Sequence, residues 1–212
     1  MIAVDHPYDA VATELADGTV AYDESQATGD DAVDQANADR SVGIRAADIH
    51  AVVNHLETAA SDVPELADAD LSTLITAGHS AGGAAAIEAA RLDGRITGVV
   101  DIDGMPRSPA GTRLSQPLIA IVAGDMEPNP LYDQALSGLL ADGNGARVTL
   151  DGVAHLGMVD IGRLIGPVPG VVGANGADGA RLAAQATLEL VKATVAGQPV
   201  DTCALGRLGP VG

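Results

Sequence analysis

The sequence has 212 residues, 47% of them hydrophobic, which is enough for one compact domain with its own core and tight for two. With three Tyr, no Phe and no Trp, the core is predicted to consist of Ala, Val, Leu and Ile. Lys and Arg number 11 against 29 Asp and Glu, and the net charge of −18 would repel nucleic acids and anionic membranes. We therefore expect no nucleic-acid partner and a solvated acidic surface.

The chain also lacks the sequence signals of disulfides and membrane spans. Cys203 is the single cysteine, so no intrachain disulfide is possible, and no metal-ligand spacing includes it. No apolar run reaches transmembrane length, and no basic segment followed by an apolar one opens the chain, so no stable membrane insertion is expected. The location is predicted to be cytoplasmic if Met1 is the natural start, and secretion is the alternative if a segment precedes it.

The first part of the chain alternates between apolar and acidic stretches. Residues 1–4 are apolar and are predicted to be the tail of a strand, with a turn-rich segment at 5–9. Residues 16–39 are rich in acidic side chains and contain no base, which predicts a solvated excursion rather than packed structure. Apolar positions at helical spacing predict an amphipathic helix over 44–56.

The remainder alternates between strand-like and helix-like stretches. An apolar run at 71–77 leads through a glycine turn into an alanine-rich helix that is predicted to end near Arg91. Further strands are predicted over 96–102, 117–123 and 147–150, and further helices over 131–140 and 180–196. This alternation predicts a single α/β domain over 1–212, with a mostly parallel sheet flanked by helices and ligands bound beyond the carboxyl ends of its strands.

Residues 78–82 have the sequence GHSAG and match the G-x-S-x-G nucleophile elbow, with the required strand before and helix after. Because the serine of this turn has a strained backbone, Gly78 and Gly82 are expected to avoid clashes, and Gly83 to let the helix pack closely. Ser80 is then predicted to be a nucleophile exposed at a helix N-terminus, with the Ala81 N–H as one oxyanion-hole donor.

A serine nucleophile requires a base to accept its proton, and in this type of fold the chain order is Ser, then Asp or Glu, then His. His155 is the one histidine that follows Ser80, and it comes directly after the last predicted strand. We therefore predict His155 as the base, carried by a mobile loop that brings its imidazole over the elbow.

The acid that orients the base has several candidates near strand ends. Asp101 and Asp103 are two residues apart and are expected to point to the same side of a strand, with Asp103 closer to the carboxyl edge. Asp125 ends the next strand, and spacing alone favours neither Asp103 nor Asp125. Asp151 precedes His155 too closely and is predicted to form a turn.

Four segments occur in a recognisable order: DHPYDA at 5–10, GHSAGG at 78–83, VDIDG at 100–104 and DGVAHL at 151–156. They resemble segments of the α/β-hydrolases similar to platelet-activating-factor acetylhydrolase, whose bacterial members are described as lipase-like or dienelactone hydrolase-like esterases. The resemblance runs from residue 1 to about residue 195 and implies the α/β-hydrolase fold. In that family the acid follows the strand after the elbow, which implies Asp103 rather than Asp125.

The resemblance also implies a role for each matching residue. Ser80 is the implied nucleophile, His155 the general base and then acid, and Asp103 the group that fixes the imidazole tautomer and stabilises its cation. Ala81 is the implied backbone donor of the oxyanion hole. No cofactor and no metal are expected, because residues 78–83 lack the lysine and Ser/Thr of a phosphate-binding loop.

The chain departs from the family pattern at its start. Related chains have a strand and a glycine-containing loop before the Asp-His-Pro-Tyr segment, and that loop supplies the second oxyanion donor. Here Met1 falls inside the strand that should follow it, so the sequence resembles a family member whose N-terminal strands are missing. His6 and Tyr8 are expected either to line an acyl or leaving-group pocket or simply to form a turn with Pro7. His79 is expected to pack within the elbow.

These observations predict a cofactor-independent serine hydrolase that cleaves a small or short-chain carboxylic ester, because nothing in the chain suggests an amphipathic lid. The alternative is a truncated hydrolase remnant that keeps the triad but is weakly active or inactive. Dienelactone-type or polyester hydrolysis by the same residues would differ in substrate alone. The sequence makes no prediction of the acyl group or the oligomeric state.

Overall fold

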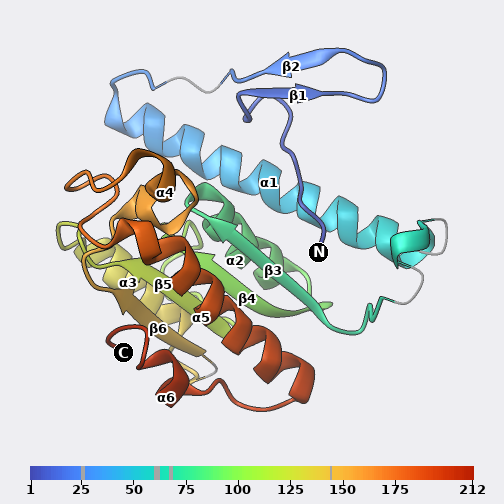
Figure 1. The fold of residues 1–212 in the computed structure, drawn as a ribbon. Coiled ribbons are helices and arrows are strands. Elements are labelled where there is room, and N and C mark those ends of the chain that lie inside the picture. Colours follow the sequence, from blue (N-terminus) through green and yellow to red (C-terminus); the bar gives the residue numbers. More distant parts are fainter. Residues whose placement is uncertain (25–26, 60–62, 67–68, 144) are drawn as a thin grey trace. The chain divides into compact units, whose positions relative to one another are not determined.

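The computed structural model describes residues 1–24, 27–59, 63–66, 69–143 and 145–212, which form two compact units, 1–67 and 68–212 (Figure 1). The single domain over 1–212 stays a prediction.

The N-terminal unit contains a short hairpin and a long helix. Strand β1 (Ala12–Glu14) pairs antiparallel with β2 (Val20–Tyr22), and α1 spans Asp31–Ala59, with a short 3-10 helix, η2, at Pro64–Leu66. Helix α1 is largely polar, and its buried apolar side chains lie at helical spacing on one face. They are Val42, Ala46, Val53 and Leu56.

Helix α1 begins at Asp31 rather than near Ile44, and β2 lies within 16–39 with Ala21 buried. The prediction of an unpacked excursion over 16–39 is therefore wrong for both elements. The carboxylate of Asp30 accepts hydrogen bonds from the first backbone N–H groups of the helix. Asp34 accepts hydrogen bonds from Thr28, and they lower the pKa of its carboxyl group. The acidic cluster therefore caps a helix N-terminus, where negative charge is favourable, instead of marking solvated coil.

The prediction that residues 1–4 end a strand is also wrong, because residues 1–6 have no regular secondary structure. Met1 and Ile2 line an apolar groove within this unit together with Val52 and Leu56 of α1. A four-residue apolar run does not distinguish a strand from an extended segment that lies along the apolar face of a helix.

The C-terminal unit is built on a four-stranded parallel sheet in the order β3-β4-β5-β6. The strands are β3 (Leu74–His79), β4 (Ile96–Ile102), β5 (Leu118–Ala123) and β6 (Gly145–Leu150). β5 is buried along its whole length and β4 nearly so, as expected for central strands covered on both faces.

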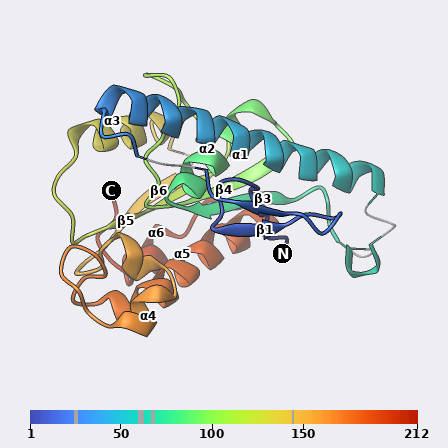
Figure 2. The same ribbon diagram turned by 90° about the horizontal axis from the view of Figure 1, so that it is seen from above.

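Helices cover both faces of this sheet (Figure 2). α2 (Ala81–Leu92) and α3 (Pro130–Leu139) lie on one face, and α5 (Gly176–Ala196) lies on the other. Short helices follow β6 and α5: η3 (His155–Met158), α4 (Ile161–Ile165) and α6 (Thr202–Leu205), which carries the exposed Cys203. The predicted strands and the longer helices of this unit are confirmed, with ends that shift by a few residues, whereas these short helices were not predicted.

The core is aliphatic, as the composition predicts. Its largest cluster packs β4, β5 and β6 against α5, and its fully buried members include Val100, Ile121, Val148 and Leu190. Alanines of α5 pack in the same cluster, and small side chains of this kind let the helix approach the sheet closely.

Truncating a side chain of this cluster should cost much more than truncating a neighbour on the outer face of α5. Leu190 is fully buried, whereas Leu188 is 48% exposed. We expect Leu190→Ala to lower the free energy of unfolding by about 2–5 kcal/mol, because it leaves a cavity. Leu188→Ala should change it by about 0.5 kcal/mol or less. Urea denaturation followed by circular dichroism measures both, and equal losses would contradict this description of the core.

Candidate active site

Ser80 lies at the sharp turn between β3 and α2, where it is the N-cap residue of the helix. Its backbone has φ 58° and ψ −127°, a conformation that non-glycine residues rarely adopt and that costs of the order of 1–3 kcal/mol. The turn is anchored to the next strand because the Ser80 N–H donates to the carbonyl oxygen of Ile102 at 2.9 Å. The predicted strand–turn–helix context of the elbow is thus confirmed.

The glycines around Ser80 have different roles. A Cβ on Gly78 would lie 2.2 Å from the backbone carbon of Gly82, so the close approach of strand and helix requires glycine at residue 78. A Cβ on Gly82 would have no described atom within 4 Å beyond its own helix and chain neighbours. The expectation that both glycines avoid clashes therefore holds for Gly78 and is wrong for Gly82.

Asp103 occupies a similar turn after β4. Its φ is 54°, and its N–H donates to the carbonyl oxygen of Ile121 on β5 at 2.8 Å. The side chain is 4% exposed, and its Oδ1 accepts a hydrogen bond from the Ala123 N–H at 2.8 Å. Backbone anchors on both sides thus fix the direction in which Oδ2 points.

His155 begins the 3-10 helix η3, five residues after the end of β6. Backbone hydrogen bonds hold the chain on both sides of it: the Ala154 N–H donates to Val172 O at 3.0 Å, and the Leu156 N–H donates to Val171 O at 2.9 Å. Two backbone hydrogen bonds therefore position the imidazole in this structure, and the mobility expected of the loop stays a prediction.

The structure brings these three residues together. His155 Nδ1 lies 2.7 Å from Asp103 Oδ2, and His155 Nε2 lies 3.0 Å from Ser80 Oγ. An ionised carboxylate can only accept a hydrogen bond, so Nδ1 carries the proton and Nε2 is left to accept one from the serine hydroxyl. This arrangement can remove a proton from Ser80 Oγ and stabilise the imidazolium that forms.

His79, the residue before Ser80, contacts the same imidazole. The two rings have centroids 4.4 Å apart, and His79 Nε2 lies 3.0 Å from the carbonyl oxygen of His155. Burial lowers the pKa of His79, and the neighbouring imidazole lowers it further, so the ring is neutral and Nε2–H donates to that carbonyl. His79 packs within the elbow as expected, and it also holds the backbone of His155.

The other acidic candidates lie elsewhere. The Asp125 carboxylate accepts a hydrogen bond from the Gly170 N–H at 3.4 Å rather than from His155. Asp151 forms part of the turn after β6, as predicted, and its carbonyl oxygen accepts a hydrogen bond from the side chain of Asn175. The structure therefore brings Asp103, and neither of these residues, to the imidazole.

Ala81, the predicted oxyanion-hole donor, is the first residue of α2. The N–H groups in the first turn of a helix have no partner within the helix, and the helix dipole favours negative charge there. An anion formed beside Ser80 would therefore meet a backbone N–H at this end of α2.

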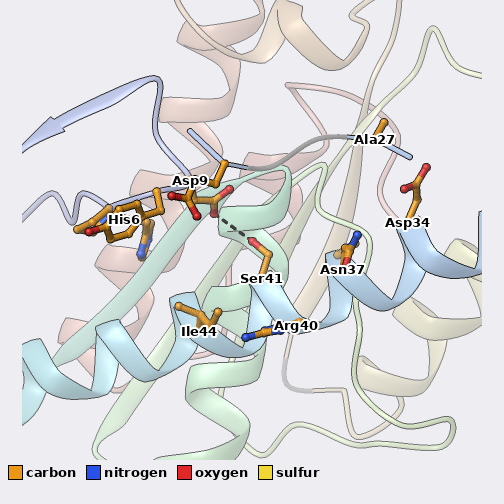
Figure 3. Close-up of a pocket in the computed structure, with 12 residues that line it drawn as sticks. His6, Asp9, Ala27, Asp34, Asn37, Arg40, Ser41 and Ile44 are labelled. Carbon is orange, nitrogen blue, oxygen red and sulfur yellow. Dashed lines mark hydrogen bonds between the residues drawn. The ribbon is translucent and has the colours of Figure 1, made fainter. Parts of the chain in front are cut away.

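A separate cavity of about 750 Å³ lies within the N-terminal unit (Figure 3). One wall is the segment before β1, in which Asp9 accepts hydrogen bonds from Ser41 and Arg45 of α1, at 3.0 and 2.5 Å. Burial raises the pKa of Asp9, but these hydrogen bonds outweigh it and lower the pKa below its ordinary value. His6 Nδ1 lies 2.7 Å from Asp48 Oδ2, within hydrogen-bond distance. The lining includes His6, Tyr8, Asp34, Asn37, Arg40 and Ile44. An acyl or leaving-group role for His6 and Tyr8 stays a prediction.

The described residues contain no group of three or more His, Cys, Asp or Glu side chains that could hold a metal ion. Within the same part of the chain, no helix is both long and apolar enough to cross a membrane.

Comparison with known proteins identifies the fold. No protein-family model and no curated protein matches the chain. Among solved structures, it is similar to a ferulic acid esterase from Streptomyces cinnamoneus, with 22% identity and a TM-score of 0.74 over 93% of this chain. It is also similar to a dienelactone hydrolase-like promiscuous phosphotriesterase from metagenomic libraries, with 18% identity, a TM-score of 0.56 and coverage of 82% of this chain and 74% of the other. The predicted α/β-hydrolase fold is therefore confirmed.

The chain spans 59% of the length of the ferulic acid esterase chain. The resemblance to the platelet-activating-factor acetylhydrolase branch in particular stays a prediction.

Substitution of the two motif glycines should separate their roles. Gly78→Ala forces a Cβ into the backbone of α2, and we expect it to lower the free energy of unfolding by about 3 kcal/mol, the upper end of ordinary overpacking costs. Gly82→Ala has room for its methyl group, so its stability should equal that of the wild type or exceed it slightly. Melting temperatures of the two variants provide the test, and equal destabilisation by both would contradict the assignment.

Proposed function

We propose that the protein hydrolyses carboxylic esters through an acyl-enzyme on Ser80. The observation that carries this proposal is the continuous path from Asp103 Oδ2 through the imidazole of His155 to Ser80 Oγ, with contacts of 2.7 and 3.0 Å. Both distances lie within the range required of a nucleophile, its base and the group that orients the base. The α/β-hydrolase fold, in which such residues follow strand ends, supports the same function.

In the proposed reaction, Ser80 Oγ attacks the ester carbonyl carbon while its proton passes to His155 Nε2. The carbonyl oxygen becomes an oxyanion, and the Ala81 N–H donates a hydrogen bond to it. When the tetrahedral intermediate collapses, the imidazolium returns the proton to the departing alcohol, and the acyl group stays on Ser80. His155 then removes a proton from water, whose oxygen attacks the acyl carbon. The bond from that carbon to Ser80 Oγ breaks, the imidazolium returns its proton to Ser80 Oγ, and the carboxylic acid is released.

Asp103 takes no proton in this scheme. It holds His155 in the tautomer that leaves Nε2 able to accept, and it stabilises the imidazolium during each transfer. The Asp103 carboxylate is itself held by the hydrogen bond from the Ala123 N–H, so the imidazole of His155 has little freedom to turn away from it.

The proposed substrate is a small or short-chain carboxylic ester. The name of the ferulic acid esterase describes an enzyme that acts on esters, which supports this bond type for the present chain. The alternative is the one drawn from the sequence, a weakly active or inactive remnant that keeps the triad. The two possibilities differ in whether Ser80 reacts.

A fluorophosphonate probe tests the nucleophile directly. We expect the wild-type protein to be labelled at one site and Ser80→Ala to remain unlabelled, because the probe reacts with a serine whose hydroxyl is activated by a base. Intact-protein mass spectrometry counts the label, and peptide mapping should find it on Ser80. A folded wild-type protein that stays unlabelled would support the remnant, and labelling of Ser80→Ala would exclude Ser80 as the nucleophile.

Replacing the two candidate acids one at a time tests the orienting group. Asp103→Asn should lower kcat for p-nitrophenyl acetate about 10⁴-fold, because an amide favours the wrong imidazole tautomer. Asp125→Asn is the matched control and should leave kcat close to that of the wild type, since Asp125 bonds to Gly170. Steady-state kinetics at neutral pH measures both variants. A large loss in Asp125→Asn with activity kept in Asp103→Asn would reverse the assignment.

A further inference from the structure

A second carboxyl group, besides that of Asp103, lies beneath the candidate site and has no part in the proposed reaction. Asp101 is on β4, two residues before Asp103, and it is completely buried. Its Oδ1 accepts a hydrogen bond from the Gly104 N–H at 2.8 Å, and its Oδ2 has no hydrogen-bond partner among the described residues. A buried carboxyl group is costly, so its presence in the central strand of a sheet calls for a physical reason.

The carboxyl group is wedged between two turns. A Cβ on Gly104, the residue after Asp103, would lie 2.5 Å from Asp101 Oδ1 and 2.4 Å from the carbonyl oxygen of Ser80. A Cβ on Gly83, in the first turn of α2, would lie 2.1 Å from the same Oδ1. One carboxyl oxygen therefore touches both the turn that holds Asp103 and the helix end that holds Ser80, and glycine on each side permits the contact.

The surroundings of Asp101 favour its neutral form. Burial raises the pKa of this carboxyl group well above its ordinary value, and the nearby negative charge of Asp103 raises it further, against the opposing effect of the Gly104 N–H. The titratable groups that face it are Asp103 and, from α3, Tyr132, whose pKa burial also raises. From α2, Gly83 contacts the carboxyl group and carries no charge. A neutral acid still supplies the oxygen that Gly104 requires.

We propose that Asp101 is a positioning residue of the Ser80 site: its buried carboxyl group ties the Asp103 turn to the nucleophile elbow. The inference rests on the proposed hydrolase function. Asp103 has a strained φ of 54°, and the bond from Gly104 to Asp101 closes the turn directly after it. Without this acceptor, the Gly104 N–H would be buried without a partner, and the turn could relax away from His155.

Three variants separate positioning from simple stability. Asp101→Ala removes the acceptor, Asp101→Asn keeps a neutral oxygen of the same shape, and Val99→Ala truncates another fully buried side chain of β4 as a control. At a temperature where all are folded, we expect Asp101→Ala to lower kcat for p-nitrophenyl acetate about 10- to 100-fold, with KM little changed. Asp101→Asn and Val99→Ala should both keep kcat close to the wild-type value.

The pH dependence of stability provides a second test, which also applies if Asp101→Ala does not fold. When the pKa of a carboxyl group is higher in the folded than in the unfolded protein, the folded protein loses stability as the pH rises above the unfolded pKa of 3.8. Asparagine has no such loss. The melting temperature of Asp101→Asn minus that of the wild type should therefore increase as the pH rises from about 4 through neutrality. A constant or shrinking difference would show that Asp101 is ionised in the folded protein and would overturn the proposed role of its neutral carboxyl group.

Hydrogen exchange of the Gly104 amide separates failure of this inference from failure of the proposed function. By NMR, this amide should exchange about tenfold faster in Asp101→Ala, the factor that the loss of one hydrogen bond typically produces, and should stay protected in Asp101→Asn. An unlabelled, inactive wild type would refute the proposed hydrolase function. The exchange result would still show whether Asp101 holds the Gly104 N–H. Unchanged exchange and unchanged kcat in Asp101→Ala would refute the positioning role of Asp101 and leave the proposed hydrolase function untouched.

Discussion

The candidate site depends on backbone strain at the carboxyl edge of a parallel sheet. Within the described part of 68–212, Ser80 and Asp103 are the two non-glycine residues with positive φ, and each directly follows the last residue of its strand. Each is held in the same way, by an N–H that donates to a carbonyl oxygen of the next strand, Ile102 or Ile121. The strain is tolerated because the sheet register determines where those acceptors lie, and it aims both side chains at one point above the sheet.

Close backbone packing provides the remaining positions. Gly78 lets α2 approach β3 closely, which places Ser80 at the N-terminal end of the helix. Hydrogen bonds from the residues on either side of His155 to residues 171–172 hold its imidazole within reach of Ser80. His79 adds a donor to the His155 carbonyl oxygen, so the base is supported through its backbone as well as through Asp103. The proposed chemistry therefore rests on turns that are held by hydrogen bonds and close packing, and reacting groups must in general be held within a fraction of an ångström.

Sequence patterns predicted the elements of the C-terminal unit well because its central strands are largely apolar and its turns are marked by glycine. They failed in the N-terminal unit. There, an acidic segment that resembles solvated coil caps α1 through Asp30 and Asp34. An apolar run that resembles a strand has no regular secondary structure and lines a groove together with residues of the helix. Both errors arise because local composition does not state which backbone groups need partners or which faces are covered.

The sequence by itself determined the α/β alternation, the elbow around Ser80 and the single histidine after it, because these depend on residue type and order. It left the acid open between Asp103 and Asp125 until a family resemblance favoured the first, and it assigned no role to Asp101. Only the tertiary structure decided that Asp103 Oδ2 meets His155 at 2.7 Å and that Asp101 is sealed between two glycines. The reason is physical: residues on neighbouring strand ends are equivalent in a linear pattern, and only packing in three dimensions determines which carboxyl group reaches the imidazole and which is buried.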